Sequence, residues 1–335
     1  MKKAPEHIIL SRPDSIGDVM LTLPMAGLLK RTYPGVRITF LGRSYTRPVL
    51  ACCEHVDKII TLEELASADA PAMLRALRAD VIIHVFPHRQ VAQWAKQAGI
   101  PKRIGTSHRW WHWTSCTDRV SFSRKRSEQH EAQLNLKLLL PLMAIPDLPL
   151  DELASFSGFH TPLATERVRS WRRSGTRQVI LHPGSKGSAV EWGPDNFAKL
   201  IRLLNDGPFT TIVTGTAAEA AHYRSILPLN GTNTIDAGGL LSLEELIGLI
   251  GASDALVAAS TGPLHIAAAS GIRAIGLYAP RRPIHPGRWA PIGNDVHALV
   301  ADPDCPACAA GKPCDCIQRI SPERVMTLLK VHPLP

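Results

Sequence analysis

Residues 255–271, ALVAASTGPLHIAAASG, combine an apolar run, a small polar pair, a Gly-Pro turn and a second apolar run. Residues 255–259 predict a buried strand, and the residues from Leu264 onward predict a helix. Ser260, Thr261 and Gly262 then lie in a strand-to-helix turn, where backbone N–H groups lack partners within the helix. Because the N-terminus of a helix carries a partial positive charge, such a turn favours the binding of an anion. An ordinary turn of an α/β domain is the alternative, because it needs glycine as well.

A second stretch, IILSRPDSIGDVMLTLP at residues 8–24, has the same order of elements. Residues 8–10 predict a short strand, and residues 19–29 predict a helix that ends before Pro34. Parallel α/β sheets place ligands beyond the carboxyl ends of their strands. Asp18, in the loop between strand and helix, is therefore a candidate functional carboxylate. Capping of the helix that begins at Val19 is the alternative role.

Predicted strands and helices alternate along the rest of the chain. Further strands are expected at residues 36–41, 57–62, 80–86, 100–104, 178–181, 210–214 and 274–278. This alternation predicts an α/β protein with parallel, doubly wound sheets. Residues 144–161 are rich in Pro, Gly and Ser and predict a linker. We therefore expect an N-terminal domain at residues 1–160, a C-terminal domain at 161–321, and a closing helical segment at 322–335.

Composition indicates a globular protein. The chain has 335 residues, of which 45% are hydrophobic. No apolar run approaches the roughly 18–20 residues that span a bilayer. The N-terminal residues have too short an apolar core for a signal peptide, so a cytoplasmic location is expected.

The charge balance indicates an anionic partner. The 38 Lys and Arg residues outnumber the 29 Asp and Glu residues, giving a formal net charge of +9. Residues 102–126 interleave Lys and Arg with three of the seven tryptophans. A surface of this kind could bind an anionic glycolipid or single-stranded nucleic acid, or could be a solvated rim with inward-packed tryptophans.

The two turns together resemble the ADP-heptose:lipopolysaccharide heptosyltransferases, glycosyltransferase family 9. Residues 16–19, Ile-Gly-Asp-Val, match a turn near the N-terminus of that family. Residues 260–265, Ser-Thr-Gly-Pro-Leu-His, match its Asp-Thr/Ser-Gly-Pro-x-His turn. Weaker matches are His-Pro-Gly-Ser at 182–185, Trp192, and Leu-Ser-Leu-Glu at 241–244. The resemblance runs over nearly the whole chain, and the order and spacing of the motifs make it specific.

This resemblance implies a GT-B fold, in which two Rossmann-like doubly wound domains face each other across a cleft. It implies an inverting glycosyltransferase that moves heptose from ADP-heptose to a hydroxyl of the anionic lipopolysaccharide inner core. The N-terminal domain would bind the acceptor and the C-terminal domain the nucleotide sugar. By analogy, the closing helix would return to the N-terminal domain.

The partners follow from the same resemblance. We expect peripheral contact with the cytoplasmic face of the inner membrane, no nucleic acid, and no cofactor for transfer. The alternatives are the same fold with another nucleotide-sugar donor or a protein acceptor, or a non-catalytic basic binding protein.

The resemblance also implies roles for individual residues. Asp18 is the expected general base, because the attacking hydroxyl has to lose its proton. Helix N-termini, hydroxyls and cations would balance the charge that develops on the leaving diphosphate. Glu219 is expected at a ribose and Leu241 at the base, both by analogy. The nucleotide-sugar candidates are Gly184, Ser185, Lys186, Glu219, Leu241, Ser260, Thr261, Gly262 and His265. The acceptor candidates are Arg43, Arg47, Arg109 and Arg124.

Two positions depart from the family pattern. Ser260 stands where the family motif usually opens with Asp, and Glu191 precedes Trp192 where a lysine is common nearby. Lys186 could reach the same phosphates from another angle. A different donor sugar therefore stays open.

Four of the seven cysteines are crowded together as Cys305, Cys308, Cys314 and Cys316. Four thiolates can bind zinc tetrahedrally or hold iron, which makes a structural metal one interpretation. Their spacing is not that of a zinc ribbon, so free thiols and disulfides are the alternatives. The odd total and the absence of a secretory signal argue against a disulfide framework.

Overall fold

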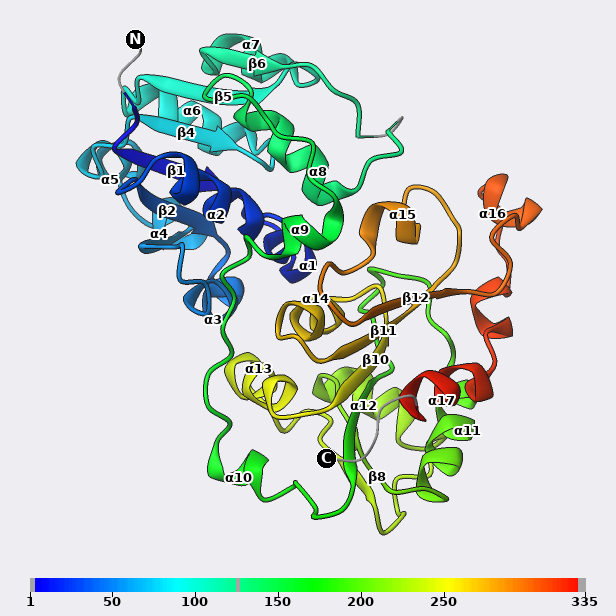
Figure 1. Ribbon diagram of the computed structural model, residues 1–335. Helices are drawn as coiled ribbons and strands as arrows, with labels where there is room; N and C mark the ends of the chain where they lie inside the picture. Colours follow the sequence, from blue (N-terminus) through cyan, green and yellow to red (C-terminus); the bar gives the residue numbers. More distant parts are fainter. Residues whose placement is uncertain (1–3, 125–126, 331–335) are drawn as a thin grey trace. The chain divides into compact units, whose positions relative to one another are not determined.

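The computed structural model describes residues 4–124 and 127–330 (Figure 1). It divides into two compact units, Met1–His160 and Thr161–Pro335, and each is described by itself. Lys125 and Arg126 of the basic stretch, and residues 331–335 of the expected closing segment, lie outside the described residues. In the part described, no helix combines the length and the apolar character needed to cross a membrane.

The first unit is built on a parallel six-stranded sheet in the order β3-β2-β1-β4-β5-β6. Its strands are β1 (His7–Ser11), β2 (Arg37–Gly42), β3 (Lys58–Thr61), β4 (Val81–His84), β5 (Lys102–Thr106) and β6 (Asp118–Val120). The order reverses between β1 and β4. Ligands bind in doubly wound sheets at the carboxyl edge of this switch point.

Helices cover both faces of this sheet, because right-handed connections to β2 and to β5 leave the sheet in opposite directions. The helices are α1 (Ile16–Met20), α2 (Leu23–Thr32), α3 (Arg47–Ala51), α4 (Leu62–Ala66), α5 (Ala70–Ala76), α6 (Arg89–Gln97), α7 (Trp110–Ser115), α8 (Glu131–Leu136) and α9 (Leu150–Ala154), with short 3₁₀ turns η1 (Ser44–Thr46) and η2 (Lys137–Leu139). On one face, α4, α5 and α6 pack on Ile9, Leu41 and Ile82 of the sheet. Elsewhere in the unit, α2 contacts α8.

One predicted helix of the first unit differs in extent. The single helix expected at residues 19–29 is split into α1 and α2 at Leu21 and Thr22. Pro24 causes the break, since it lacks an N–H and fits only the first turn of a helix. The break leaves Asp18 in a short helix of its own.

The second unit repeats the architecture with the strand order β12-β11-β10-β7-β8-β9. All pairs are parallel, and the strands are β7 (Arg177–His182), β8 (Phe209–Val213), β9 (Thr234–Asp236), β10 (Ala255–Ala259), β11 (Arg273–Tyr278) and β12 (Val296–Val300). The switch point lies between β7 and β10. Ala258 is in register with His182, and Leu181 with Val213, so β10, β7 and β8 end at one edge.

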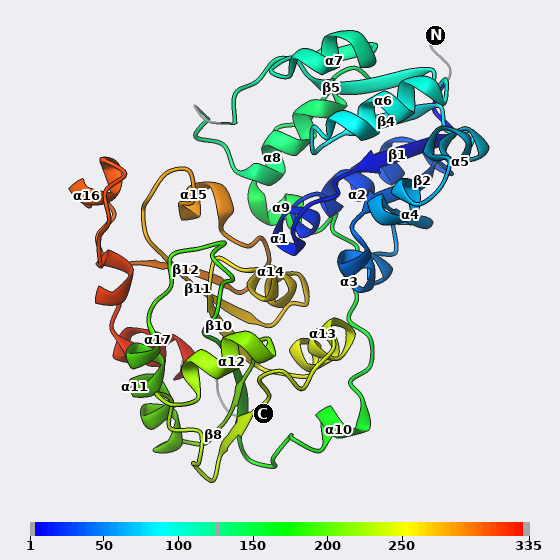
Figure 2. The same cartoon turned by 180° about the vertical axis from the view of Figure 1, so that it is seen from behind.

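Helices of the second unit lie on both sides of its sheet (Figure 2). They are α10 (Glu166–Arg169), α11 (Pro194–Asn205), α12 (Ala217–Tyr223), α13 (Leu243–Gly251), α14 (Gly262–Ala269), α15 (Pro286–Trp289), α16 (Pro306–Ala309) and α17 (Pro322–Lys330), with the 3₁₀ turn η3 (Cys316–Arg319). α13 packs on α14, while α11 packs on α17. Val325 and Leu329 of α17 are buried in the core that Val179 and Val257 of the sheet also line. The closing helix, as far as Lys330, therefore lies in the second unit.

Candidate functional site

Asp18 lies where the switch point of the first sheet predicts a ligand site. β1 ends at Ser11, and Arg12, Pro13, Asp14 and Ser15 connect it to α1, of which Asp18 is the third residue. The Asp18 side chain is 15% exposed. A carboxylate at this position is reachable from solvent and held by the structure around it.

The contacts of Asp18 separate the two roles that the sequence left open. One carboxylate oxygen accepts a bond from the Arg12 guanidinium and the other accepts a bond from the Ser15 hydroxyl. Ser15 is the N-cap of α1 and makes no side-chain capping bond, while its backbone N–H donates to Asp14 at 2.9 Å. The Asp18 carboxylate is thus bound by two side chains and does not cap the helix.

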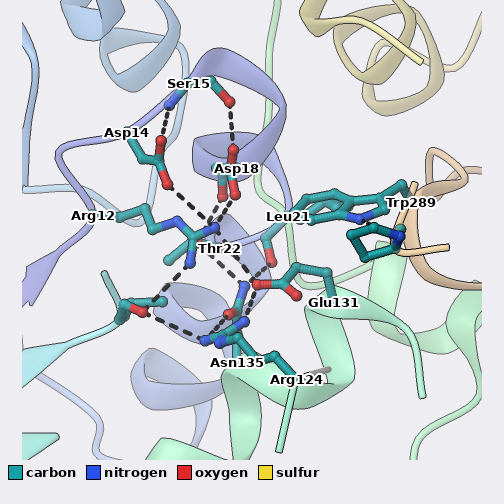
Figure 3. Close-up of polar contacts among 12 residues, drawn as sticks. Arg12, Asp14, Ser15, Asp18, Leu21, Thr22, Arg124, Glu131, Asn135 and Trp289 are labelled. Atoms are coloured by element: carbon teal, nitrogen blue, oxygen red, sulfur yellow. Dashed lines mark hydrogen bonds and ion pairs between the residues drawn. The ribbon is translucent and has the colours of Figure 1, made fainter. Parts of the chain in front are cut away.

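Arg12 connects Asp18 to a buried network of charges (Figure 3). Its guanidinium is 5% exposed and also lies 3.6 Å from the Asp14 carboxylate and 3.5 Å from that of Glu131. Glu131, at 1% exposure, is further paired with Arg124. Buried charges are stable only when they are paired in this way. The guanidinium that binds Asp18 is thus shared with two other carboxylates.

Side-chain amides and hydroxyls extend this network into the core. Arg124 donates to Asn135 Oδ1 at 3.0 Å. Asn135 Nδ2 in turn donates to the Leu21 carbonyl at 3.0 Å, and the Thr22 hydroxyl donates to the Asp18 carbonyl at 2.7 Å. The C-terminal end of α1 is therefore joined to α8 through Asn135.

The four arginines predicted to bind an acceptor lie after three strands of the first sheet, and each has a protein partner. Arg43, after β2, donates to Glu63 at 2.6 Å, and Arg47 pairs with Glu64. Arg109, after β5, lies over the Trp111 ring at 5.8 Å. Arg124, after β6, pairs with Glu131 as described. Arg43 and Arg47 are more than two-fifths exposed, so their pairs with carboxylates are open to exchange with an anionic ligand.

The tryptophans of the basic stretch form an exposed aromatic face on α7. Trp110 and Trp113 are 62% and 60% exposed. Arg89 lies 4.8 Å from the centre of the Trp110 ring, and Arg119 lies 4.6 Å from that of Trp113. These two tryptophans do not pack inward, which excludes for them the interpretation as core residues.

In the second unit, the loop after β7 carries Gly184, Ser185 and Lys186. The N–H and hydroxyl of Ser185 both donate to one carboxylate oxygen of Glu191, at 2.8 and 2.7 Å. Lys186 is exposed and has a φ of 50°, which is uncommon for a residue with a Cβ. The loop therefore presents a cation, but Ser185 already binds an internal anion. Sequence spacing gave no sign of this contact.

Glu219 lies close to the same loop, on the first turn of α12. One of its carboxylate oxygens accepts from the Thr216 N–H and hydroxyl, both at 2.8 Å, as a capping box. Burial raises its pKa, but the bonds from Thr216 more than offset this, so the pKa lies below its ordinary value. The other oxygen faces Gly184, where an added Cβ would lie 2.4 Å from it. Any larger residue at position 184 would therefore clash with the Glu219 carboxylate.

His182 is the last residue of β7, behind this loop. Its Nδ1 lies 2.9 Å from the Thr214 hydroxyl, and burial lowers its pKa. The His182 imidazole is therefore favoured in its neutral form, at the end of the strand that precedes the loop.

The turn after β10 joins a buried strand to a helix, as the sequence predicts, but α14 begins at Gly262, two residues earlier than expected. Thr261 is the N-cap of α14 with extended backbone and no side-chain capping bond. Its hydroxyl is buried, with no hydrogen-bond partner among the described residues, and the residue is 6% exposed. Buried polar atoms without partners are rare. This hydroxyl lies at the N-terminus of an eight-residue helix, where it could donate a hydrogen bond to an oxygen atom of a bound anion.

The other candidates of this turn are arranged around Thr261. Ser260 bonds to the Tyr278 hydroxyl. His265 is buried in the first turn of α14, and Pro263 in the same turn has no N–H to offer. Leu241 lies after β9, half-buried and directly before the N-cap Ser242. The nucleotide-sugar candidates thus follow β7, β8, β9 and β10, four neighbouring strands of one sheet.

The four clustered cysteines come together in space. Their sulfur atoms all lie within 4.8 Å of one another, and Cys305, Cys308 and Cys316 are buried. All four are free thiols, which excludes disulfides between them in this structure. Their arrangement is taken up below.

Sequence reasoning missed the partners of Asp18. Arg12 directly follows an apolar strand and precedes a proline, and a charged residue at such a place was a usable signal. Glu131 gave no signal, because it is the first residue of an ordinary amphipathic helix. The N-cap of α11 is Gly193, whose φ of 92° suits glycine, and Pro194 opens the helix.

Comparison with known proteins places these two units in a family. A family model described as glycosyltransferase family 9 (heptosyltransferase) matches residues 71–316. A protein of Haemophilus influenzae named "Putative glycosyltransferase" is 28% identical over 308 residues, covering 88% of each chain. Lipopolysaccharide heptosyltransferase 3 of Escherichia coli is 23% identical over 303 residues, covering 84% of each.

A solved structure shows the same fold. The structure titled E. coli ADP-heptose lps heptosyltransferase II has a TM-score of 0.76 at 19% identity, and the match covers 96% of this chain and 97% of that one. The expected GT-B fold, with two Rossmann-like doubly wound domains, is confirmed. Because the family model matches more than half of the chain, this protein belongs to glycosyltransferase family 9, the heptosyltransferase family, and is a glycosyltransferase.

Proposed function

We propose that this enzyme transfers heptose from ADP-heptose, with inversion, to a hydroxyl of an anionic lipopolysaccharide inner core, with Asp18 as the general base. The single observation that carries the proposal is the Asp18 carboxylate, held at the switch point by Arg12 and Ser15 instead of capping its helix. Family membership supports the reaction class. The similar E. coli protein, titled with ADP-heptose and lps, supports the choice of donor and acceptor.

The reaction needs one proton acceptor and one site for a leaving anion. The acceptor oxygen attacks the anomeric carbon and forms the new C–O bond while the bond from that carbon to the diphosphate breaks. The hydroxyl proton passes to Asp18, and ADP leaves with the electron pair. A positioned carboxylate base contributes about 10²–10⁴-fold to such a step.

The role of Arg12 follows from its contacts. It holds the Asp18 carboxylate in one orientation and keeps it charged before the acceptor arrives. Glu131 and Asp14 balance the remaining charge of Arg12, so that it does not neutralise Asp18 completely. Asp18 is thereby oriented without losing all of its ability to take a proton.

The donor diphosphate is assigned to the edge formed by the ends of β7 and β10. The N-terminus of α14 offers the Gly262 N–H and the Thr261 hydroxyl, which has no hydrogen-bond partner in the described part of the chain. Lys186 supplies a positive charge, and Glu219 is assigned to a ribose hydroxyl. These groups would stabilise the charge that develops on ADP as it leaves. Ser260, bonded to Tyr278, is assigned to the sugar side of the donor.

Membrane contact is assigned to the α7 face. Exposed tryptophans beside arginines are typical of proteins that bind the headgroup region of anionic membranes. Cosedimentation with vesicles of anionic phosphatidylglycerol is expected to exceed cosedimentation with zwitterionic phosphatidylcholine. The double variant Trp110→Ala/Trp113→Ala should lose most of that binding. Preference for oligonucleotides over the anionic vesicles would contradict this assignment.

The reaction itself is tested by product analysis. The purified chain is incubated with ADP-heptose and truncated lipopolysaccharide, and the product is analysed by mass spectrometry and for anomeric configuration. One added heptose with inverted configuration is expected. Transfer only from another nucleotide sugar, or only to a protein, would overturn the assignment of donor or acceptor.

Nucleotide binding is tested separately by thermal shift. ADP at 100 times its Kd should stabilise the protein by about 2.7 kcal/mol. UDP and GDP at the same concentration should stabilise it less. Equal stabilisation by all three would contradict the choice of an adenine nucleotide.

A further inference from the structure

The cysteine cluster lies near the end of the second unit and has a defined geometry. Cys308 Sγ lies 3.1 Å from Cys314 Sγ and 3.3 Å from Cys316 Sγ. Cys305 Sγ lies 3.7 Å from Cys314 Sγ, and all four atoms are within 4.8 Å of one another. Four sulfur atoms thus converge on one point.

These separations match those of a metal tetrahedron. Zn–S bonds of about 2.3 Å place the sulfur atoms of a tetrahedral site roughly 3.8 Å apart. A disulfide would place two of them at about 2.05 Å, much closer than any pair here. The separation of Cys305 Sγ and Cys314 Sγ, 3.7 Å, is close to the zinc spacing, the two separations at Cys308 Sγ are shorter, and no pair exceeds 4.8 Å, so small side-chain movements would bring the four sulfur atoms to a zinc site.

The local chain is built to bring the four thiols together. Cys305 is the N-cap of the short helix α16 and Cys308 lies within it. The chain turns back at Gly311, whose φ is 68°, and Cys316 opens η3. The Cys316 backbone N–H donates to Cys314 Sγ at 3.4 Å, a bond of the kind that stabilises a thiolate.

The same segment is joined to the loop that carries candidate donor residues. Trp192, fully buried, donates its indole N–H to the Ile320 carbonyl at 2.8 Å. Asn196 donates to the Gln318 carbonyl, also at 2.8 Å. Trp192 directly follows Glu191, the residue that binds Ser185. Whatever fixes η3 therefore also fixes one end of the loop from Gly184 to Glu191.

We propose that Cys305, Cys308, Cys314 and Cys316 bind one Zn²⁺ ion through four thiolates as a closed structural site. Tetrahedral sulfur sites suit zinc, and four protein ligands leave no open position for catalysis. The ion would hold α16 and η3 together and, through Ile320 and Gln318, fasten Trp192 and the start of α11. This inference does not depend on the donor or acceptor of the proposed reaction.

Metal content of the full-length protein is the first test. Inductively coupled plasma mass spectrometry is expected to give one zinc per chain, and the variant Cys314→Ser should lose it. Cys314→His should retain zinc, because imidazole is also a zinc ligand. Cys52→Ser is the matched control, since Cys52 is a half-buried thiol of the first unit that donates to the Pro48 carbonyl and does not belong to the cluster of four cysteines.

Spectroscopy on the unmodified chain keeps the test decisive if a variant fails to fold. Replacement of the ion by Co²⁺ should produce the ligand-field bands of a tetrahedral site and strong thiolate-to-cobalt charge transfer. Removal of the ion by a mercurial reagent and chelator should speed hydrogen exchange at residues 192–196 and 316–321, and leave the sheet of the first unit unchanged.

Other results would contradict the proposed zinc site. A chain that contains no metal when purified with zinc, or that retains full zinc in Cys314→Ser, would overturn the site. One equivalent of iron in place of zinc would overturn the choice of ion. Disulfides among the four cysteines, found by alkylation and mass spectrometry of protein purified without oxidant, would overturn the thiolate ligation.

Discussion

Replacement of Asp18 by Asn tests the proposed base most directly. The amide keeps the size of the side chain but cannot accept the hydroxyl proton. We expect kcat to fall by about 10²–10⁴-fold, equivalent to about 2.7–5.4 kcal/mol in the activation free energy. The KM for the donor should change little, because Asp18 belongs to the first unit and the diphosphate is assigned to the second.

The same substitution also has a structural cost that can be bounded. Loss of one partner from a buried ion pair costs roughly 3–5 kcal/mol. Arg12 keeps the carboxylates of Asp14 and Glu131 at 3.6 and 3.5 Å, and Asp18 is partly exposed, so we expect only about 1–3 kcal/mol. The variant should therefore stay folded, with a lower melting temperature.

The assay measures the initial rate of ADP release at saturating donor and acceptor, together with ADP binding by calorimetry and thermal unfolding. Asp14→Asn is the matched control, because it removes the same charge from the same guanidinium and should keep kcat within a few-fold. A kcat for Asp18→Asn within tenfold of the unmodified enzyme would refute the assignment. An equal loss in Asp14→Asn, or a loss of ADP binding in parallel with kcat, would assign Asp18 a structural role instead.

Three other predictions concern buried or loop residues. Thr261→Val removes a buried hydroxyl that bonds to none of the residues described, so it should raise the unfolding free energy of the ligand-free protein by about 1 kcal/mol and weaken ADP binding about five- to tenfold. Denaturant titration and calorimetry check this, and tighter ADP binding would contradict it. Glu191→Gln removes an anion beside Ser185, so ADP should bind several-fold more tightly, and weaker binding would show that the loop needs the charge. Burial lowers the pKa of His84 to about 3 from 6.5, so the unfolded chain binds the proton first as the pH falls. Stability should therefore decrease from pH 6.5 towards pH 3, by at most about 4–5 kcal/mol, and His84→Phe should flatten that part of the curve of unfolding free energy against pH.

The sequence was sufficient for the central strands and for the edge strand β3, and insufficient for the other three edge strands. β1, β2, β7, β10 and β11 are short, nearly continuous apolar runs, which is the pattern of a strand buried on both faces. β6, β9 and β12 were not predicted. β6 and β9 have three residues each, and β12 is mostly half-buried at the sheet edge. Edge strands need less apolar surface, so their pattern is weak.

The candidate site was predictable in position but not in its contacts. Asp18 and Thr261 follow apolar strands, so their place at the sheet edge could be inferred from the chain alone. The pairing of Arg12 with Glu131 joins residues more than a hundred positions apart, and the bond from Ser185 to Glu191 depends on the path of one loop. Neither follows from local spacing, because each depends on how the chain returns to the same place.

The packing of α17 has a consequence for how the protein is made. The core around β7 includes Val325 and Leu329, and Trp192 is anchored by Ile320, so the second unit cannot close its core until these late residues are available. The first unit contains all of its own sheet within Met1–His160. During synthesis it can fold first, whereas the second unit waits with exposed apolar surface until residue 329 has left the ribosome. Premature termination before α17 should therefore yield an aggregation-prone product in which only the first half is native.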